Sequence, residues 1–218
     1  MTKKVDFYFD YGSPATYLAW TQIDKIIKNA NAELNMIPML LGGVFKETGN
    51  SSPAFIPAKS KWMNKDLKKH AEIYGVDYNS NSFFPINTLN LMRGAIAARK
   101  MNIFEKYSEA IFTGIWVKDV NLGDIPILQY YLNKNGIDTK KLFSLVQSDE
   151  IKTSLIKNTA EAVEKGVFGA PTFIVNNELI FGQDRLEFLK LALKLNIFFL
   201  CIVILGEYID LFRYNLNM

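Results

Sequence analysis

The chain has 218 residues, of which 49% are hydrophobic, so it is long enough to bury the core of one large folded domain. Its 25 basic and 22 acidic residues give a formal net charge of +3 and are mixed along the sequence, with no basic block. This charge pattern argues against nucleic acid as a partner.

The cysteine count and the N-terminus restrict the chemistry and the compartment. Cys201 is the only cysteine, so neither an intramolecular disulfide nor a multi-cysteine zinc site can form, and dithiol chemistry would need an outside thiol. The first ten residues contain no apolar stretch with a small-residue cleavage site, so we expect a cytoplasmic protein. The apolar run 197–205 is too short to span a bilayer, which needs about 20 residues.

The chain begins with a pattern typical of a β-α-β unit. Residues 5–10 predict a buried strand, Tyr11-Gly12 a turn, and residues 14–30 an amphipathic helix. Residues 32–41 predict a second strand because apolar and polar residues alternate and then become continuously apolar.

The middle of the chain shows helical patterns, and the end returns to strands. Helices are expected within 59–76, 87–101, 103–117, 125–136 and 139–166. Residues 171–182 predict a hairpin that turns at Asn176-Asn177, and 184–195 predict a helix that Asp184 would cap.

The order β-α-β, helices, β-β-α suits an α/β protein with a thioredoxin-like domain and an inserted all-helical domain. The predicted boundaries are 1–45 and 166–196 for the thioredoxin-like domain, 46–165 for the insertion, and 197–218 for an atypical apolar tail. The pattern alone leaves other α/β topologies open.

Two short stretches combine into a candidate site. Pro14 is favoured at the first helical position, which places Ser13 at the N-cap, beside unpaired backbone N–H groups that attract an anion. Ala170-Pro171 precedes a predicted strand, where a cis peptide bond is a specific structural option. Taken singly, an ordinary helix cap and a plain turn are the simpler explanations of these residues.

Four stretches together resemble the 2-hydroxychromene-2-carboxylate isomerases and the related kappa-class glutathione transferases: "VDFYFDYGSPATYLA", "LLGGVFKETGN", "FPINTLNLMR" and "GVFGAPTFIVNNELIFGQDRLEFL". The resemblance covers about residues 4–195. It implies a thioredoxin-like fold with a helical insertion, glutathione as cofactor, and a homodimer. It also implies that Ser13 replaces the first cysteine of the thioredoxin-type redox motif and binds the glutathione sulfur.

The resemblance extends to the rest of the glutathione site. Ala170, next to Pro171, would pair with the cysteinyl part. Gln183 and Asp184 would bind the γ-glutamyl end, although Asp184 also suits a helix cap. Asn50 and Lys59 match another glutathione-contacting stretch. Lys46 is a weaker candidate for the acidic substrate, and for both lysines an exposed surface role is the alternative.

The function that the resemblance implies is glutathione-dependent isomerisation of a 2-hydroxychromene-2-carboxylate-type aromatic catabolite. One alternative is conjugation of glutathione to an electrophile. Another, from a different class, is a glutathione-binding module without turnover. Disulfide exchange by the protein itself would need a dithiol that the sequence lacks. His70 receives no role, and we expect no metal site around it.

Overall fold

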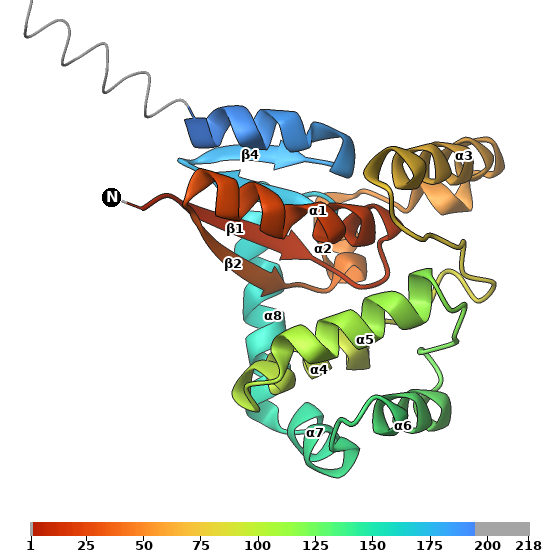
Figure 1. Ribbon diagram of the computed structural model, residues 1–218. Helices are drawn as coiled ribbons and strands as arrows, with labels where there is room; N and C mark the ends of the chain where they lie inside the picture. The colour runs from red at the N-terminus through yellow and green to blue at the C-terminus, as the bar shows by residue number, and fades with distance from the viewer. Residues whose placement is uncertain (1, 195–218) are drawn as a thin grey trace, which may run out of the picture.

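The computed structural model describes residues 2–194, and these form a four-stranded sheet with helices on both faces (Figure 1). The strands are β1 (Lys4–Phe9), β2 (Glu33–Pro38), β3 (Thr172–Val175) and β4 (Glu178–Phe181). Their order is β2-β1-β3-β4, with β1 parallel to β2 and β3 antiparallel to both β1 and β4. This arrangement confirms the predicted thioredoxin-like fold.

The β-α-β unit follows the sequence pattern closely. The helix α1 (Pro14–Ala30) buries Leu18, Ala19 and Ile23, which recur at the spacing of one helix face. It ends at Asn31, whose left-handed φ of 48° lets its backbone N–H bond two carbonyls of the last turn. The apolar stripe therefore lies over the sheet, and Ser13 lies at the carboxyl end of β1.

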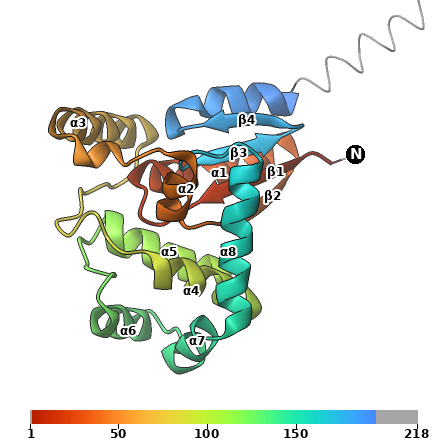
Figure 2. The same ribbon diagram turned by 180° about the vertical axis from the view of Figure 1, so that it is seen from behind.

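Between β2 and β3, where every residue is described, the structure forms a succession of helices and no strand. They are α2 (Leu41–Thr48), the short 3-10 turn η1 (Pro53–Phe55), α3 (Pro57–Tyr74), α4 (Leu89–Lys100), α5 (Phe104–Trp116), α6 (Ile125–Lys134), α7 (Thr139–Val146) and α8 (Asp149–Glu164). Figure 2 shows α4 to α7 grouped beyond one side of the sheet, and α8 running from that group back across it. The domain boundary at residue 46 stays a prediction.

Three expectations about elements need correction. The single helix predicted over 139–166 is two helices, because Ser148 caps a new helix with its side-chain oxygen. The second strand ends at Pro38, and residues 41–48 form α2. Asp184 caps no helix: it lies inside a 3-10 turn, η2 (Gln183–Arg185), that begins after Gly182 without a side-chain cap.

The hairpin prediction is confirmed. Asn176 and Asn177 connect β3 to β4 with φ values of 51° and 63°, the left-handed conformation that asparagine tolerates and that a tight hairpin turn requires. Residues 186–194 are helical after η2. The predicted tail, 197–218, lies outside the described residues.

The strands alternate their side chains between two cores. Val5, Phe7 and Phe9 pack into the large cluster that includes α1, α4 and α5. Tyr8 points to the other face and packs with residues of α2 and α8. Because both faces of β1 are buried, packing on two sides fixes its carboxyl end. This packing also fixes the position of the turn and of Ser13, which follow β1 directly.

Candidate functional site

The site is centred on Ser13, at the corner between β1 and α1. Ser13 has extended backbone angles, and its side-chain oxygen accepts a hydrogen bond from the Thr16 N–H at 3.1 Å. This confirms the predicted N-cap. Ser13 is 5% exposed, and its hydroxyl donates a proton to the Ala170 carbonyl oxygen at 2.9 Å. Ser13 therefore contacts a loop 157 residues away while the helix N-terminus provides a positive electrostatic environment.

The loop that faces Ser13 contains a cis peptide bond between Ala170 and Pro171. Thr172 donates its hydroxyl proton back to the Gly169 carbonyl at 2.8 Å, and the Gly182 N–H donates to the Pro171 carbonyl at 3.0 Å. The second bond joins this loop to the end of β4. The Ala170 carbonyl thus lies where β1, β3 and β4 converge.

Asp10, which the sequence did not predict as a site residue, is buried beside the corner and connects it to α2 and to the start of α4. Asp10 is 1% exposed, and its carboxylate accepts from the Gly12 N–H at 2.9 Å, the Leu41 N–H at 2.8 Å and the Thr88 hydroxyl at 3.1 Å. Burial raises the pKa of Asp10 above its usual range, and these three hydrogen bonds oppose that shift. The available sequence signal was an acid at the end of a buried strand, three positions before Ser13.

The turn between β1 and α1 needs a glycine at position 12 because Thr88 and Asp10 leave no room for a side chain. A Cβ atom at Gly12 would lie 2.9 Å from the Thr88 Cγ2, closer than non-bonded carbon atoms approach. Tyr11 beside it is buried: its hydroxyl shares a hydrogen bond with the Ser108 hydroxyl at 2.7 Å, and its backbone carbonyl accepts from the Trp116 indole N–H at 2.8 Å. The corner is therefore fixed by α2, α4 and α5 as well as by the sheet.

Asn50 is hydrogen-bonded to the cis-proline loop, whereas Lys59 makes no hydrogen bond or ion pair with it in the described part of the chain. The Asn50 side-chain amide donates to the Phe168 carbonyl at 2.9 Å, two residues before Ala170. Lys59 is exposed near the start of α3, and within residues 2–194 its ammonium makes no hydrogen bond or ion pair.

Gln183 and Asp184 follow β4, next to the end of α3. Gln183 is buried, and its backbone carbonyl accepts from the Tyr74 hydroxyl at 2.6 Å. Asp184 is partly exposed and forms an ion pair with the neighbouring Arg185. Burial, followed by the charges of Asp184 and Glu187, raises the pKa of Tyr74. The Asp184 carboxylate is therefore solvent-accessible and lies close to a tyrosine hydroxyl that remains protonated.

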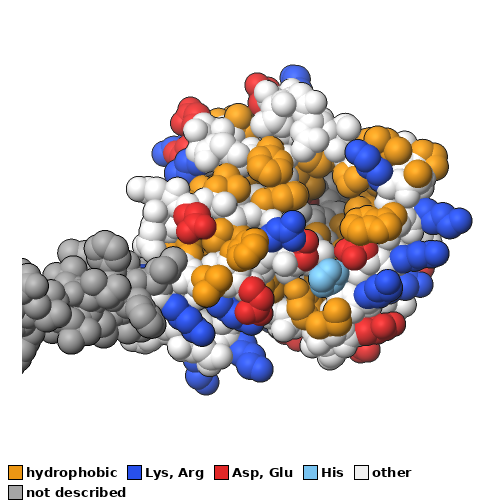
Figure 3. Space-filling view, turned by 90° about the horizontal axis from the view of Figure 1, so that it is seen from above, with side chains coloured by type: hydrophobic (Ala, Val, Ile, Leu, Met, Phe, Trp, Pro, Cys, Tyr) orange, Lys and Arg blue, Asp and Glu red, His pale blue; other side chains and the backbone are white. Residues whose placement is uncertain are grey.

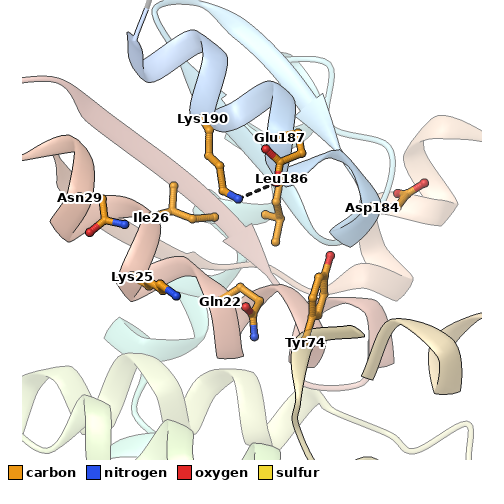
Figure 4. Close-up of a pocket in the computed structure, with 9 residues that line it drawn as sticks. All are labelled: Gln22, Lys25, Ile26, Asn29, Tyr74, Asp184, Leu186, Glu187 and Lys190. Atoms are coloured by element: carbon orange, nitrogen blue, oxygen red, sulfur yellow. Dashed lines mark hydrogen bonds and ion pairs between the residues drawn. The ribbon is translucent and has the colours of Figure 1, made fainter. Parts of the chain in front are cut away.

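A small cavity of about 170 Å³ lies between α1, Tyr74 and the final helix (Figure 4). Figure 4 shows Tyr74 pointing toward Leu186, with Asp184 at one end of the group, Asn29 and Lys25 at the other, and Lys190 paired with Glu187 between them. None of Ser13, Asn50 or Ala170 lines this cavity. It borders one end of the predicted site and does not contain its centre.

Lys46, the weaker substrate candidate, is exposed on α2. It lines a different pocket, between α2, α4 and α8, and within residues 2–194 it makes no hydrogen bond with Ser13 or Ala170. The structure thus brings Ser13, Ala170 and Pro171 together, places Asn50, Gln183 and Asp184 near the same loops, and leaves both lysines apart.

Two further features concern the residues that the structure describes. Within 2–194, no three residues of the types histidine, cysteine, aspartate and glutamate are grouped so that they could bind a metal ion. No helix of that part of the chain is both long and apolar enough to cross a membrane.

Comparison with known proteins identifies relatives over nearly the whole described chain. The family profile "DSBA-like thioredoxin domain" matches residues 4–194. A 2-hydroxychromene-2-carboxylate isomerase from Sphingobium xenophagum is 29% identical over 87% of this chain and 97% of its own length. A glutathione S-transferase kappa 2 from Caenorhabditis elegans is 30% identical over 84% and 88%. A solved structure of a 2-hydroxychromene-2-carboxylate isomerase superposes with a TM-score of 0.79 at 24% identity, over 95% of this chain and 98% of that one.

The sheet order and the serine at the helix N-terminus define a DsbA-like thioredoxin-fold protein that lacks the dithiol. The matches are more specific than the fold. The chain belongs to the family of 2-hydroxychromene-2-carboxylate isomerases and kappa-class glutathione transferases within the DsbA-like proteins.

Proposed function

We propose that the protein is a glutathione-dependent isomerase of 2-hydroxychromene-2-carboxylate-type aromatic catabolites. The observation that carries the proposal is the Ser13 hydroxyl, which lies at a helix N-terminus and donates to the Ala170 carbonyl beside a cis proline. Relatives named as this isomerase, at 29% identity over most of both chains, support the substrate class.

The residues at the corner suit a glutathione thiol. The chain has no cysteine there, so glutathione would supply the sulfur nucleophile that adds to an electrophilic carbon and is later released. Ser13 is small, nearly buried and able to donate one hydrogen bond, and the first turn of α1 adds its positive end. A hydroxyl donor and a helix N-terminus both favour the thiolate over the thiol.

In the proposed complex, two hydrogen bonds are exchanged. The Ser13 hydroxyl turns from the Ala170 carbonyl to the sulfur, and the Ala170 carbonyl then accepts from the cysteinyl N–H, as in the addition of a strand. Ser13 keeps accepting the Thr16 N–H throughout, so the cap of α1 is not disturbed. A charged hydrogen bond is worth about 1.5–3 kcal/mol, which lowers the thiol pKa of about 8.5 toward neutral pH.

The remaining residues would bind the ends of the tripeptide. The Asp184 carboxylate would meet the γ-glutamyl ammonium, beside the backbone of Gln183. Asn50 is held near Pro171 by its bond to the Phe168 carbonyl and would contact the peptide from the other side. Lys59 would pair with a carboxylate, which requires its exposed side chain to move toward the corner.

The test is to follow the products and the glutathione together. Incubation with a 2-hydroxychromene-2-carboxylate and substoichiometric glutathione should give many turnovers per glutathione, because an isomerase returns the thiol. Stoichiometric consumption of glutathione with an electrophile would instead establish the transferase activity. That alternative is favoured by the relatives named as kappa transferases, including the one from Rattus norvegicus at 26% identity.

A third outcome would separate catalysis from binding. Saturable glutathione binding without turnover of chromene carboxylates or of simple electrophiles would leave a glutathione-binding module. Absence of glutathione binding would remove the whole proposal.

A homodimer and a cytoplasmic location belong to the same proposal. Several large apolar side chains remain exposed in the single chain, among them Phe55 at 70% and Trp62 at 66%. Figure 3 shows hydrophobic side chains gathered around a hollow on the face seen from above. Light scattering after size-exclusion chromatography should give a mass near twice the 24.9 kDa of the chain.

A further inference from the structure

A second pocket, between α2, α4 and α8, takes no part in the proposed glutathione chemistry. In Figure 2, α8 faces the viewer, with α2 and α4 on its left. The pocket has a volume of about 480 Å³, within the range of about 300–1,000 Å³ that small-molecule sites occupy. None of Ser13, Asn50, Ala170 or Gln183 lines it.

The wall of this pocket is mainly apolar. One face of α8 contributes residues at the spacing of successive helical turns, and α2 and α4 add leucines at their beginnings. Ile156 is 68% exposed, so apolar surface remains in contact with water in the single chain. The apolar lining residues are Leu40, Leu89, Leu155, Ile156, Ala160 and Val163.

Arg93 is the unusual residue of the pocket. It lies on α4, one turn after Leu89, and its side chain is half-buried. The Nε atom is fully buried and has no hydrogen-bond partner, and within residues 2–194 the guanidinium makes no hydrogen bond, ion pair or aromatic contact. Buried polar groups are normally paired. Because the Nε atom is closed off from solvent, the terminal N–H groups of Arg93 are the donors that a ligand in the pocket can reach.

Among the described residues, two cations of the pocket, Arg93 and Lys46, make no ion pair, and Arg93 is the more buried of the two. Lys46 and Lys152 add two cations, and Glu47 and Glu164 add two anions. Lys152 already pairs with Asp149 at 3.6 Å. In the described part of the chain, neither glutamate lies within ion-pair distance of Arg93. With three cations and two anions, the lining carries a net charge of +1.

We propose that this pocket binds a small apolar carboxylic acid, with its carboxylate on Arg93 and its hydrocarbon part against the leucines. The guanidinium can present its two terminal N–H groups as a pair of parallel donors, a geometry that matches a carboxylate. The hydrocarbon would cover apolar surface that is now exposed to water. The inference stands on the pocket itself and does not depend on the proposed glutathione chemistry.

The pocket also borders the network beneath Ser13. Leu40 precedes Leu41, and Leu89 follows Thr88, and both Leu41 and Thr88 donate to the Asp10 carboxylate. Because the two sites share no lining residue apart from the weak candidate Lys46, glutathione should not compete with the acid for its place.

The experiment is calorimetric titration of the full-length protein with 2-naphthoate and with 2-naphthamide, a neutral compound of nearly the same shape. We expect the acid to bind at least about tenfold more tightly than the amide, the ratio that one charge-assisted hydrogen bond supports. Arg93→Gln should remove that preference, whereas Lys152→Gln, which changes a cation of the same pocket, should keep most of it. Equal affinity for acid and amide in the wild type would overturn the proposal.

A second measurement observes Arg93 directly in the wild-type protein. In the wild type, the side-chain N–H resonance of the Arg93 Nε, assigned by its loss in Arg93→Lys, should shift on addition of 2-naphthoate. The shift should persist in saturating glutathione and in Ser13→Ala. A shift that glutathione abolishes would place the acid in the glutathione site, and an unperturbed Arg93 resonance would exclude Arg93 as its partner.

Discussion

At the residue scale, Ser13 combines two roles that a single substitution separates. Ser13→Ala removes the acceptor of the Thr16 N–H and should lower the free energy of unfolding by about 1 kcal/mol, as expected for a lost N-cap. It also removes the proposed donor to the sulfur, so the pKa of bound glutathione should rise by about one to two pH units. Ultraviolet titration of the thiolate in the two complexes measures this difference.

The matched control is Ser13→Thr, which keeps both the hydroxyl donor and the cap. It should bind glutathione with a thiol pKa close to that of the wild type, and its turnover near neutral pH should exceed that of Ser13→Ala. If Ser13→Ala keeps the wild-type thiol pKa and full activity, Ser13 is only a helix cap.

Asp10 provides a pH test at the same scale. Because burial raises its folded-state pKa above the ordinary value of 3.8, the folded protein binds this proton more tightly than the unfolded chain. The contribution of Asp10 to stability is therefore greatest below about pH 3.8 and is lost as the pH rises through the folded pKa. Urea unfolding of the wild type and of Asp10→Asn at successive pH values measures this. The wild type should be most stable relative to the variant at low pH, and this advantage should shrink as the pH rises.

Thr88→Val sharpens this pH test. It removes one of the hydrogen bonds that lower the Asp10 pKa, so the loss of stability should extend to higher pH than in the wild type. A difference between wild type and Asp10→Asn that does not change between about pH 3 and 7 would contradict the raised pKa.

At the element scale, the elements that the sequence predicted well are those with local signals. A short buried apolar run predicted β1, the Ser13-Pro14 start predicted α1, and paired asparagines predicted the hairpin. The helix α2 was missed because Gly42 and Gly43 disfavour a helix locally. Gly43 is needed there for packing, since a Cβ atom would lie 3.1 Å from the Thr159 Cγ2 on α8.

In the candidate site too, only the residues with a local sequence signal could be predicted. Its centre, Ser13 with Ala170, was predictable because both residues lie in short recognisable stretches. Asp10 was not, because its partners Leu41 and Thr88 lie 31 and 78 positions away and no local pattern indicates that they meet. Lys46 and Lys59 were assigned from the sequence alone. Both side chains are exposed, and within residues 2–194 neither makes a hydrogen bond or ion pair that fixes its position.

The boundary between α7 and α8 gives a prediction for an element. Ser148 caps α8 and also bonds the last turn of α7: its side-chain oxygen accepts from the Ile151 N–H at 3.4 Å, and its hydroxyl donates to the Leu145 carbonyl at 2.7 Å. Ser148→Ala should therefore lower the free energy of unfolding by about 1 kcal/mol in urea. Ser148→Asp should retain most of the stability, because aspartate is an equally good N-cap at the positive end of α8.

Ser154→Ala is the control within the same helix. Ser154 is in the middle of α8, where its hydroxyl donates to the Glu150 carbonyl one turn earlier. Alanine favours a helix interior, so this change should be neutral or slightly stabilising. Equal losses in Ser148→Ala and Ser154→Ala would mean that the two helices do not depend on the cap.

At the scale of the whole molecule, the sheet and the helices after it share one aromatic core. Phe9 of β1 packs against Phe104 and Phe112, with ring centroids 6.2 and 6.4 Å apart, and Tyr11 lies 4.8 Å from Phe112. The Ser13 corner is thus placed by contacts from both halves of the fold. A substitution that weakens the packing of α5 should therefore also shift the Ser13 corner, because Trp116 of α5 is hydrogen-bonded to Tyr11.

The last prediction concerns residues 197–218, which lie outside the described part of the chain. Every residue of the proposed glutathione site, from Ser13 to Asp184, lies within 2–194, and the family match also ends at residue 194. Deleting 197–218 should therefore leave the glutathione Kd within about threefold, or roughly 0.7 kcal/mol. Calorimetric titration measures the Kd, and circular dichroism shows whether the truncated chain is folded. A folded truncation that loses more than about tenfold in affinity would show that the segment contributes to the site, and the site would then have to be extended beyond the thioredoxin-like fold.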